Sequence, residues 1–444
     1  LLRVGFGEAG AGIISANLQQ TDGKGGSAAV NPLLPGVRIY AVIGFCDIHH
    51  FEEINRLLTN DVLIFVNTIA EIVHSRVHYW GGQCNKNLGN AFVILWRIGD
   101  ELDVQLQSQG GGGSKKSITA ASRTKGPSKV VDLRRVPGVD KLADHALVGY
   151  LKIIAEINRN DKIIEYRKEP RLTQNGTKKY KVSMGFGLHA GWAIEGAVGS
   201  IHKVDATYLS PHVNMAARLE TSSRQYGVPI LISQNAFDLF SSDTQKLCRK
   251  CDVVTVKGSE VPIGVFTYDA LQDQMFPKTR IQTLDANEVL ELCPEEEEAV
   301  VRRAERFAQM GMLPPPYDED NSDEECDDTV YTGAVSKIGS GEVTFGRNNM
   351  DTSELFEIDT DLRILRAHAF DAEFLAMFKS GVDDYLEGSW ASAKQKLTAA
   401  DKMMATLAPA LGGDGPCKTL LDYMVEMGPD SPDWWKGYRP LTAK

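Results

Sequence analysis

Apolar residues along the first part of the chain predict a strand followed by a helix. Residues 37–45 form a nearly unbroken apolar run, typical of a buried strand, which ends in Cys46-Asp47. Apolar positions then recur at helical spacing over residues 61–79. The sequence Trp80-Gly81-Gly82 breaks this pattern. We therefore expect a strand and a helix that pack against each other.

The pattern continues as an alternation of strands and helices up to Ala270. Two short strands are expected over residues 83–97, with a turn near residues 88–90, and Asn175-Gly176 is a strong signal for another hairpin turn. The other expected elements are helices over 141–158 and 213–226, strand structure within 182–198, and strands around Ile230 and Val253.

A basic segment interrupts this alternation. A glycine run begins at Gly110, and residues 115–135 contain seven Lys or Arg and one acidic residue. This composition predicts a flexible insertion spanning about residues 101–138. The insertion is either simply solvated or a contact for an anionic partner, such as a lipid or an acidic protein surface.

The chain after residue 272 changes character twice. Residues 273–362 are expected to be a charged, partly disordered linker, because residues 318–328 hold eight acidic residues and prolines precede them. Residues 363–444 are expected to be mainly helical. The pattern of Phe378, Tyr385, Gly388, Trp390 and Ala393 is similar to one tetratricopeptide helix pair. One unit is not a repeat array, so we expect it to pack on a neighbouring part of the chain, or alternatively to hold a partner in a groove.

Composition limits the class of protein. The net charge of -11 argues against general nucleic-acid binding. No apolar run reaches the roughly 18 residues typical of a membrane helix, and the first residues lack the basic leader of a signal peptide. The chain begins without Met, so we expect a piece of a longer protein, whose other parts could attach it to a membrane or a cytoskeletal assembly.

The seven cysteines are scattered, which predicts reduced thiols facing the cytoplasm. Cys248 and Cys251 have CxxC spacing but lack the second pair or nearby His that would complete a zinc site. We interpret their spacing as coincidence.

Four segments together resemble the class III adenylyl and guanylyl cyclases. These segments are GFCDIHHF (44–51), NKNLGNAFVILW (85–96), GFGLHAGWAIEGAVGS (185–200) and VNMAARLE (213–220). They follow the order of that family over roughly half of the chain. The resemblance implies an α+β fold, a ferredoxin-like βαββαβ cyclase homology domain over residues 31–272. Residues 1–30 would precede this domain as a leading segment.

The resemblance implies a site with two Mg²⁺ or Mn²⁺ ions held by two aspartates. The first aspartate matches Asp47. The alternative is that Asp47 has only a structural role, in a turn or at a helix cap. The second matches Asn90, where the sequence departs from the family: an amide keeps a carbonyl oxygen but loses the negative charge. Losing one positioned charge costs about 3 kcal/mol in a transition state, roughly a hundredfold in rate.

The nucleotide-binding positions of the implied site match the family more fully than the metal-binding positions do. Asn214 and Arg218 are four residues apart, hence on one face of a helix, and match the family residues that orient the ribose and stabilise phosphate charge. Lys86 and Thr207 match the base-reading positions, where Lys with Thr favours ATP over GTP. Lys257 is similar to a triphosphate-binding lysine, with an ordinary turn lysine as the alternative.

Two further features bear on the implied site. Ser210-Pro211 replaces the Gly-Asp that usually precedes the VN pair, which affects the loop beside Thr207. His49 and His50 follow Asp47; we expect solvent-facing loop histidines, with additional metal ligands as the alternative.

Because the resemblance implies a site shared between two cyclase domains, and this chain shows one, a homodimer or heterodimer is implied. Three hypotheses follow: a weak ATP cyclase, one half of a heterodimeric cyclase, or a catalytically silent nucleotide-binding or scaffolding module.

Overall fold

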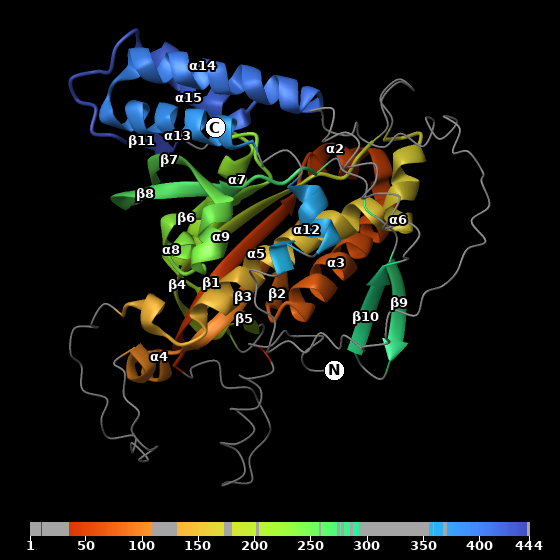
Figure 1. The fold of residues 1–444 in the computed structure, drawn as a ribbon. Helices are drawn as coiled ribbons and strands as arrows, with labels where there is room; N and C mark the ends of the chain where they lie inside the picture. Colours follow the sequence, from red (N-terminus) through yellow and green to blue (C-terminus); the bar gives the residue numbers. More distant parts are fainter. Residues whose placement is uncertain are drawn as a thin grey trace, which may run out of the picture.

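The computed structural model shown in Figure 1 describes the following residues: 10, 35–108, 131–172, 180–200, 204–256, 259–272, 276, 279–284, 287–292, 355–357, 359–366 and 371–441. Several expectations fall outside them: the leading segment, the centre of the basic insertion, the Asn175-Gly176 turn, Lys257 and the acidic run 318–328.

A mixed sheet organises the first part of the chain. Within the described residues, nine strands form one sheet in the order β11-β7-β8-β6-β4-β1-β3-β2, with β5 paired to β4. The strands are β1 (Val37–Ile48), β2 (Gln83–Asn87), β3 (Ala91–Asp100), β4 (Met184–Gly199), β5 (Val204–Leu209), β6 (Ile230–Ser233), β7 (Cys248–Val256), β8 (Ser259–Tyr268) and β11 (Arg439–Leu441). A separate hairpin pairs β9 (Thr279–Leu284) with β10 (Asn287–Leu292).

Helices join and cover these strands. In chain order they are α2 (Phe51–Leu58), α3 (Val62–Tyr79), α4 (Glu101–Ser108), α5 (Val139–Arg159), α6 (Asp161–Glu165), α7 (Pro211–Ser223), α8 (Gln234–Phe237), α9 (Ser242–Leu247), α12 (Thr360–Leu365), α13 (Ala372–Glu387), α14 (Trp390–Leu407) and α15 (Gly415–Met427). The order β1-α3-β2-β3-α5-β4 with the strand sequence β4-β1-β3-β2 is ferredoxin-like. The predicted α+β fold class is confirmed.

The two faces of β1 serve different layers. Tyr40, Val42 and Cys46 belong to the core shared with α3 and α5. The intervening Ile39, Ala41 and Ile43 lie on the opposite face, in a smaller core that includes Ala216 of α7. Because side chains alternate along a strand, Asp47 continues the second series and faces the side covered by α7.

Glycines in β4 let α7 lie close to the sheet. Gly185, Gly187 and Gly191 are two or four residues apart and share one face of the strand. A Cβ at Gly187 would lie 2.1 Å from the carbonyl oxygen of Ala216, and one at Gly185 would lie 2.4 Å from Oε1 of Glu220. The spacing of these glycines therefore sets the position of α7 above the sheet.

The apolar segment that contains α3 is part of the core. By length and hydropathy, the described segment Phe51–Tyr79 is one candidate to cross a membrane. However, Phe65, Ile69, Val73 and Val77 are fully buried against the sheet and α5. We interpret this segment as a core helix of the fold.

A chain segment that follows the acidic run returns to the core of the mixed sheet. Leu355, Leu362 and Leu365 are buried in the same core as α5, and α12 lies against α5 (Figure 1). Asp361 accepts bonds from Nζ of Lys152 at 2.7 Å and from both terminal nitrogens of Arg159 at 2.8 Å. The expected linker 273–362 thus ends in an element anchored to α5.

The predicted helical tail is confirmed as the helices α13, α14 and α15, which form the uppermost layer in Figure 1. Its core contains the predicted aromatic positions Phe378, Tyr385 and Trp390. The strand β11 then pairs in parallel with β7, the edge of the rest of the sheet. The neighbour on which the tail packs is therefore the far edge of the same sheet.

One buried ion pair fixes this attachment. Nε of Arg439 donates to Oδ2 of Asp252 at 2.7 Å, and the Tyr226 hydroxyl donates to the same oxygen at 2.7 Å. Asp252 is 0% exposed. A buried carboxylate is stable only when it has hydrogen-bonding or charged partners. Arg439 is therefore required to stabilise Asp252 where β11 covers the edge of β7.

Candidate functional site

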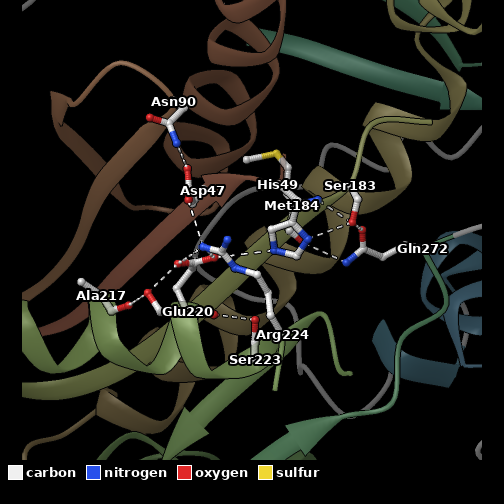
Figure 2. Close-up of polar contacts among 11 residues, drawn as sticks. Asp47, His49, Asn90, Ser183, Met184, Ala217, Glu220, Ser223, Arg224 and Gln272 are labelled. Carbon is white, nitrogen blue, oxygen red and sulfur yellow. Dashed lines mark hydrogen bonds and ion pairs between the residues drawn. The ribbon is translucent and has the colours of Figure 1, made fainter. Parts of the chain in front are cut away.

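Asp47 and Asn90 lie side by side at the end of β1. Asp47 is paired in register with Ala91, so the residue that precedes β3 comes next to it. The backbone N–H of Ile48 donates to the carbonyl of Asn90 at 3.1 Å. Figure 2 shows the consequence: Nδ2 of Asn90 donates to Oδ1 of Asp47. The structure thus brings together the two residues that the sequence places on the metal side of the implied site.

Arg224 approaches the other oxygen of Asp47. Its Nη2 lies 3.3 Å from Oδ2 of Asp47 and 3.3 Å from Oε1 of Glu220 (Figure 2). Arg224 directly follows the last residue of α7, where a cation is stabilised by the carbonyl end of the helix. The spacing from Glu220 is four residues, so the two side chains lie on one face of the helix end.

Glu220 and His49 extend this group into the interior. The Glu220 side chain is 1% exposed, and Nε2 of His49 lies 3.6 Å from its Oε1, an ion pair when the ring is protonated. Nδ1 of His49 lies 3.2 Å from the hydroxyl of Ser183. The expectation that His49 faces solvent is wrong, because its side chain is only 13% exposed and is held by these partners. His50 is exposed, as predicted.

Burial changes the protonation of Asp47. Its pKa is raised to about 6, chiefly by desolvation and secondly by the nearby Glu220 carboxylate. Arg224, His49 and the N–H of Ile48 act in the opposite direction. Burial and the neighbouring Glu220 carboxylate therefore disfavour the charged form of Asp47, and both of its oxygens accept hydrogen bonds from other groups of this chain.

The residues around Asp47 do not fit a site for two divalent cations. Such a site needs several hard oxygen ligands with net negative charge. Here the amide N–H of Asn90 and the guanidinium of Arg224 both donate hydrogen bonds to the carboxylate of Asp47. Within the described part of the chain, no group of three or more His, Cys, Asp or Glu is placed to hold a metal ion.

The helix α7 presents the catalytic candidates Asn214 and Arg218. Asn214 is exposed and Arg218 is partly buried. Ser210-Pro211, the departure noted in the sequence, forms a regular helix start: Oγ of Ser210 accepts from the N–H of His212 at 3.0 Å, and Pro211 is the first helical residue. Asn214 lies near this start, and Arg224 lies ten residues on, roughly 15 Å along the helix axis.

The base-reading candidates also lie near one another. Nζ of Lys86, on β2, lies 3.9 Å from Oδ2 of Asp205, on β5. Thr207 is two residues after Asp205, so both side chains point to the same face of β5. Lys86 and Asp205 are each nearly half exposed. The structure therefore leaves these polar groups accessible to a ligand.

A pair of histidines connects β4 to the start of α7. Nε2 of His189 on β4 lies 2.8 Å from Nδ1 of His212, and its Nδ1 lies 2.7 Å from the Ser233 hydroxyl. The pKa of His189 is lowered to about 3, chiefly by desolvation and secondly by His212. His189 is thus held neutral beneath the helix that carries Asn214.

Glu220, Arg224 and the role of His49 were not predicted from the sequence. A signal was present, because Glu220 closes the segment VNMAARLE and Arg224 follows it at helical spacing. The contact of Arg224 with Asp47 joins residues 177 positions apart, which no local pattern indicates.

No family model matches the chain. In sequence it is similar to an adenylate cyclase of Anabaena cylindrica, with 30% identity over 107 residues, 24% of this chain and 21% of that protein. It is also similar to the terminal-differentiation specific adenylate cyclase of Dictyostelium discoideum, with 30% identity over 226 residues, 50% of this chain and 8% of that protein. The chain thus spans about a fifth or less of the length of these relatives.

Two of the solved structures that the chain matches are described as adenylyl cyclases. A bacterial light-regulated adenylyl cyclase matches with 21% identity and a TM-score of 0.37 over 54% of this chain and 55% of that one. The adenylyl cyclase CyaB from P. aeruginosa matches with 20% identity and a TM-score of 0.36 over 52% of this chain and 95% of that one.

The relatives confirm the resemblance carried by the four sequence segments, and the ferredoxin-like strand order agrees with the fold that it implies. In sequence the chain is thus similar to adenylate cyclases over up to half of its length, in agreement with its resemblance to the class III cyclase family.

Proposed function

We propose that the chain supplies the nucleotide-binding half of a nucleotidyl cyclase site, with ATP favoured over GTP, and completes that site with a second cyclase domain. The observation that carries the proposal is the contrast between the two halves of the site. Asn214 and Arg218 are retained on one face of α7, whereas the metal side has an amide at Asn90 that bonds to Asp47.

The chemistry assigned to this half is binding and charge stabilisation. In cyclisation the ribose 3′ oxygen attacks the α-phosphorus; the bond from that phosphorus to the bridging oxygen breaks, pyrophosphate leaves, and the 3′ proton is released. Arg218 would stabilise charge on the phosphate through its permanent, forked guanidinium, and Asn214 would orient the ribose. Lys86 and Thr207 would contact the adenine.

The second domain would bring the carboxylates that hold divalent cations. When bound, these cations activate the attacking oxygen and neutralise the triphosphate. A heterodimer with a domain that has both aspartates gives one competent site. A homodimer has Asn90 in both sites and is expected to be slow.

A second candidate is a catalytically silent module that binds nucleotide or serves as a scaffold. The bond from Asn90 to Asp47 favours it, because the carboxylate is satisfied within the chain. The two candidates share a nucleotide-binding surface and differ in whether a partner domain can complete catalysis.

Nucleotide binding and turnover separate these candidates. The purified chain is titrated with ATP and GTP by calorimetry, alongside Arg218→Ala and, as a control, the exposed Arg56→Ala. ATP should bind more tightly than GTP. Arg218→Ala should lower the affinity for ATP at least tenfold, and Arg56→Ala should leave that affinity unchanged.

Cyclic nucleotide formation is assayed with Mg²⁺ or Mn²⁺ in parallel for the wild type and Asn90→Asp. Product should be weak for the wild type and should rise with Asn90→Asp, by up to roughly a hundredfold if one charge is the whole defect. If neither protein binds nucleotide or forms product, the proposal fails and an interaction module remains.

A further inference from the structure

The position of Arg224 suggests a reason beyond Asn90 for the poor fit of metal ions. We infer that Arg224 acts as a built-in cation for Asp47, so that this carboxylate anchors α7 to β1 and does not hold a metal ion. The inference deepens the proposed function, since it assigns the metal-holding role to a partner domain with two accessible carboxylates. It rests on cation binding and stability, so it can fail independently of cyclase activity.

Both carboxylate oxygens of Asp47 already accept hydrogen bonds from this chain. Nδ2 of Asn90 donates to Oδ1, and Nη2 of Arg224 donates to Oδ2 at 3.3 Å (Figure 2). A carboxylate accepts only, so an amide that faces it presents its N–H group and turns its carbonyl oxygen away. Asn90 therefore blocks one oxygen of Asp47 in this arrangement and does not act beside it as a ligand.

Arg224 is held beside Asp47 by a second carboxylate as well. Its Nη2 is also 3.3 Å from Oε1 of Glu220, whose side chain is 1% exposed. A buried carboxylate needs a cation or several donors, so moving Arg224 away leaves Glu220 short of a partner. The helix end at Ser223 further favours a positive charge at this position.

The position of the helix fixes the position of the guanidinium. Glu220 lies in the last turn of α7 and Arg224 directly follows the helix, which is held close to the sheet because Gly185 and Gly187 leave no side chain between them. A Cβ at Gly185 would lie 2.4 Å from Oε1 of Glu220. The guanidinium is therefore delivered to Asp47 by a helix whose distance from the strand is fixed. The contact joins β1 to the end of α7, while Asn214 and Arg218 lie nearer the start of that helix.

The test measures Mn²⁺ binding by electron paramagnetic resonance, without nucleotide, on the full chain. The proteins are the wild type, Arg224→Gln, Asn90→Asp, Asn90→Asp combined with Arg224→Gln, and Asn90→Asp combined with the exposed control Arg56→Gln. Asp47→Asn defines binding that does not involve the site. Thermal unfolding of each protein without metal shows that the variants compared are folded.

We expect the wild type to bind Mn²⁺ no more tightly than Asp47→Asn, and Asn90→Asp to bind weakly. Adding Arg224→Gln to Asn90→Asp should tighten Mn²⁺ binding at least tenfold, and adding Arg56→Gln should not. Arg224→Gln alone should lower the unfolding temperature, because Asp47 and Glu220 lose their shared cation.

Two results would overturn the inference. One is wild-type Mn²⁺ binding that Asp47→Asn abolishes, since Arg224 would then give way to a metal. The other is an equal affinity of Asn90→Asp with and without Arg224→Gln, since the guanidinium would then have no influence on the site. Nucleotide binding through Arg218 could persist in either case, so the proposed function would be judged separately.

Discussion

His189 and His212 meet beneath the start of α7, where neither ring is free to take up a second proton. Nε2 of His189 lies 2.8 Å from Nδ1 of His212, and burial lowers the pKa of both rings. On its other side, His189 contacts the hydroxyl of Ser233, a neutral group. Protonation of the pair would bury a positive charge next to another ring, with Arg38 adding repulsion at His212.

This pair predicts a loss of stability in mild acid. In the unfolded chain His189 has an ordinary pKa of 6.5, and in the folded chain its pKa is about 3. The unfolded state therefore binds the extra proton below pH 6.5, and the folded state is favoured above it. Between pH 6.5 and pH 5 this one group should lower the free energy of unfolding by about 2 kcal/mol.

The measurement is urea unfolding at pH 7 and pH 5 for the wild type, His189→Gln, and the exposed control His78→Gln. Gln cannot titrate, so the difference between the two pH values should be smaller for His189→Gln than for the wild type. Equal pH dependence in the wild type and His189→Gln would show that the ring is not held neutral. The control should follow the wild type.

Single residues were identified from the sequence where a motif surrounds them. Asp47, Asn90, Asn214 and Arg218 were located by short segments, and the structure places the first two in contact. Arg224 was missed because its importance depends on a strand far away in the sequence. The same holds for His49, whose burial comes from Ser183 and Glu220 and not from its own neighbours.

At the scale of elements, the close packing of α7 on β4 depends on Gly187. A Cβ at Gly187 would lie 2.1 Å from the carbonyl oxygen of Ala216 and 2.5 Å from the backbone nitrogen of Glu220. Both atoms belong to the backbone, which cannot rotate away as a side chain can. Adding one methyl group must therefore lift α7 from the sheet.

Gly187→Ala is thus expected to destabilise the fold by about 1–3 kcal/mol, the usual cost of overpacking. Gly149→Ala in α5 is a matched control with the opposite expectation. Its Cβ would meet Trp96 at 3.4 Å, an ordinary contact, and alanine favours a helix over glycine by about 1 kcal/mol. Denaturant unfolding of the two variants checks the signs, and a neutral Gly187→Ala would contradict the close approach of α7.

The elements with strong local patterns were predictable from the sequence. β1, α3, the β2–β3 hairpin and α5 were expected within a few residues of their bounds, because each combines an apolar period with a clear break. α12 and β11 were not expected as parts of the sheet region. α12 is six residues long and β11 three, too short for a period, and their places are set by ion pairs to Lys152 and Asp252.

At the scale of the whole molecule, Arg439 joins the helical tail to the sheet. Besides Asp252, it meets the Tyr226 hydroxyl at 3.0 Å, and its guanidinium lies 5.0 Å from the ring centre of Tyr423. Tyr423 belongs to α15 and Tyr226 follows α7, so one side chain links both parts. Thr419 of α15 adds a bond of 2.6 Å to the carbonyl of Gln225.

Arg439→Met is therefore expected to cost about 3–5 kcal/mol, because it leaves Asp252 buried without its cation. Adding Asp252→Asn should recover part of this loss by removing the unpaired charge. Lys246→Ala, which breaks an exposed ion pair with Asp243, should change stability by about 0–1 kcal/mol. Urea unfolding gives the values, and hydrogen exchange at β7 and α15 locates the change. Similar values for Arg439→Met and Lys246→Ala would contradict the role of Arg439.

The parallel pairing of β11 with β7 also has a consequence for biosynthesis. Arg439 is 187 residues downstream of Asp252, so a growing chain presents β7 long before its partner strand exists. At about 5–20 residues per second, the ribosome needs about 10–40 s to supply the missing strand. During that interval an edge of the sheet and the carboxylate of Asp252 remain uncovered, which makes the nascent chain a substrate for chaperones at this point.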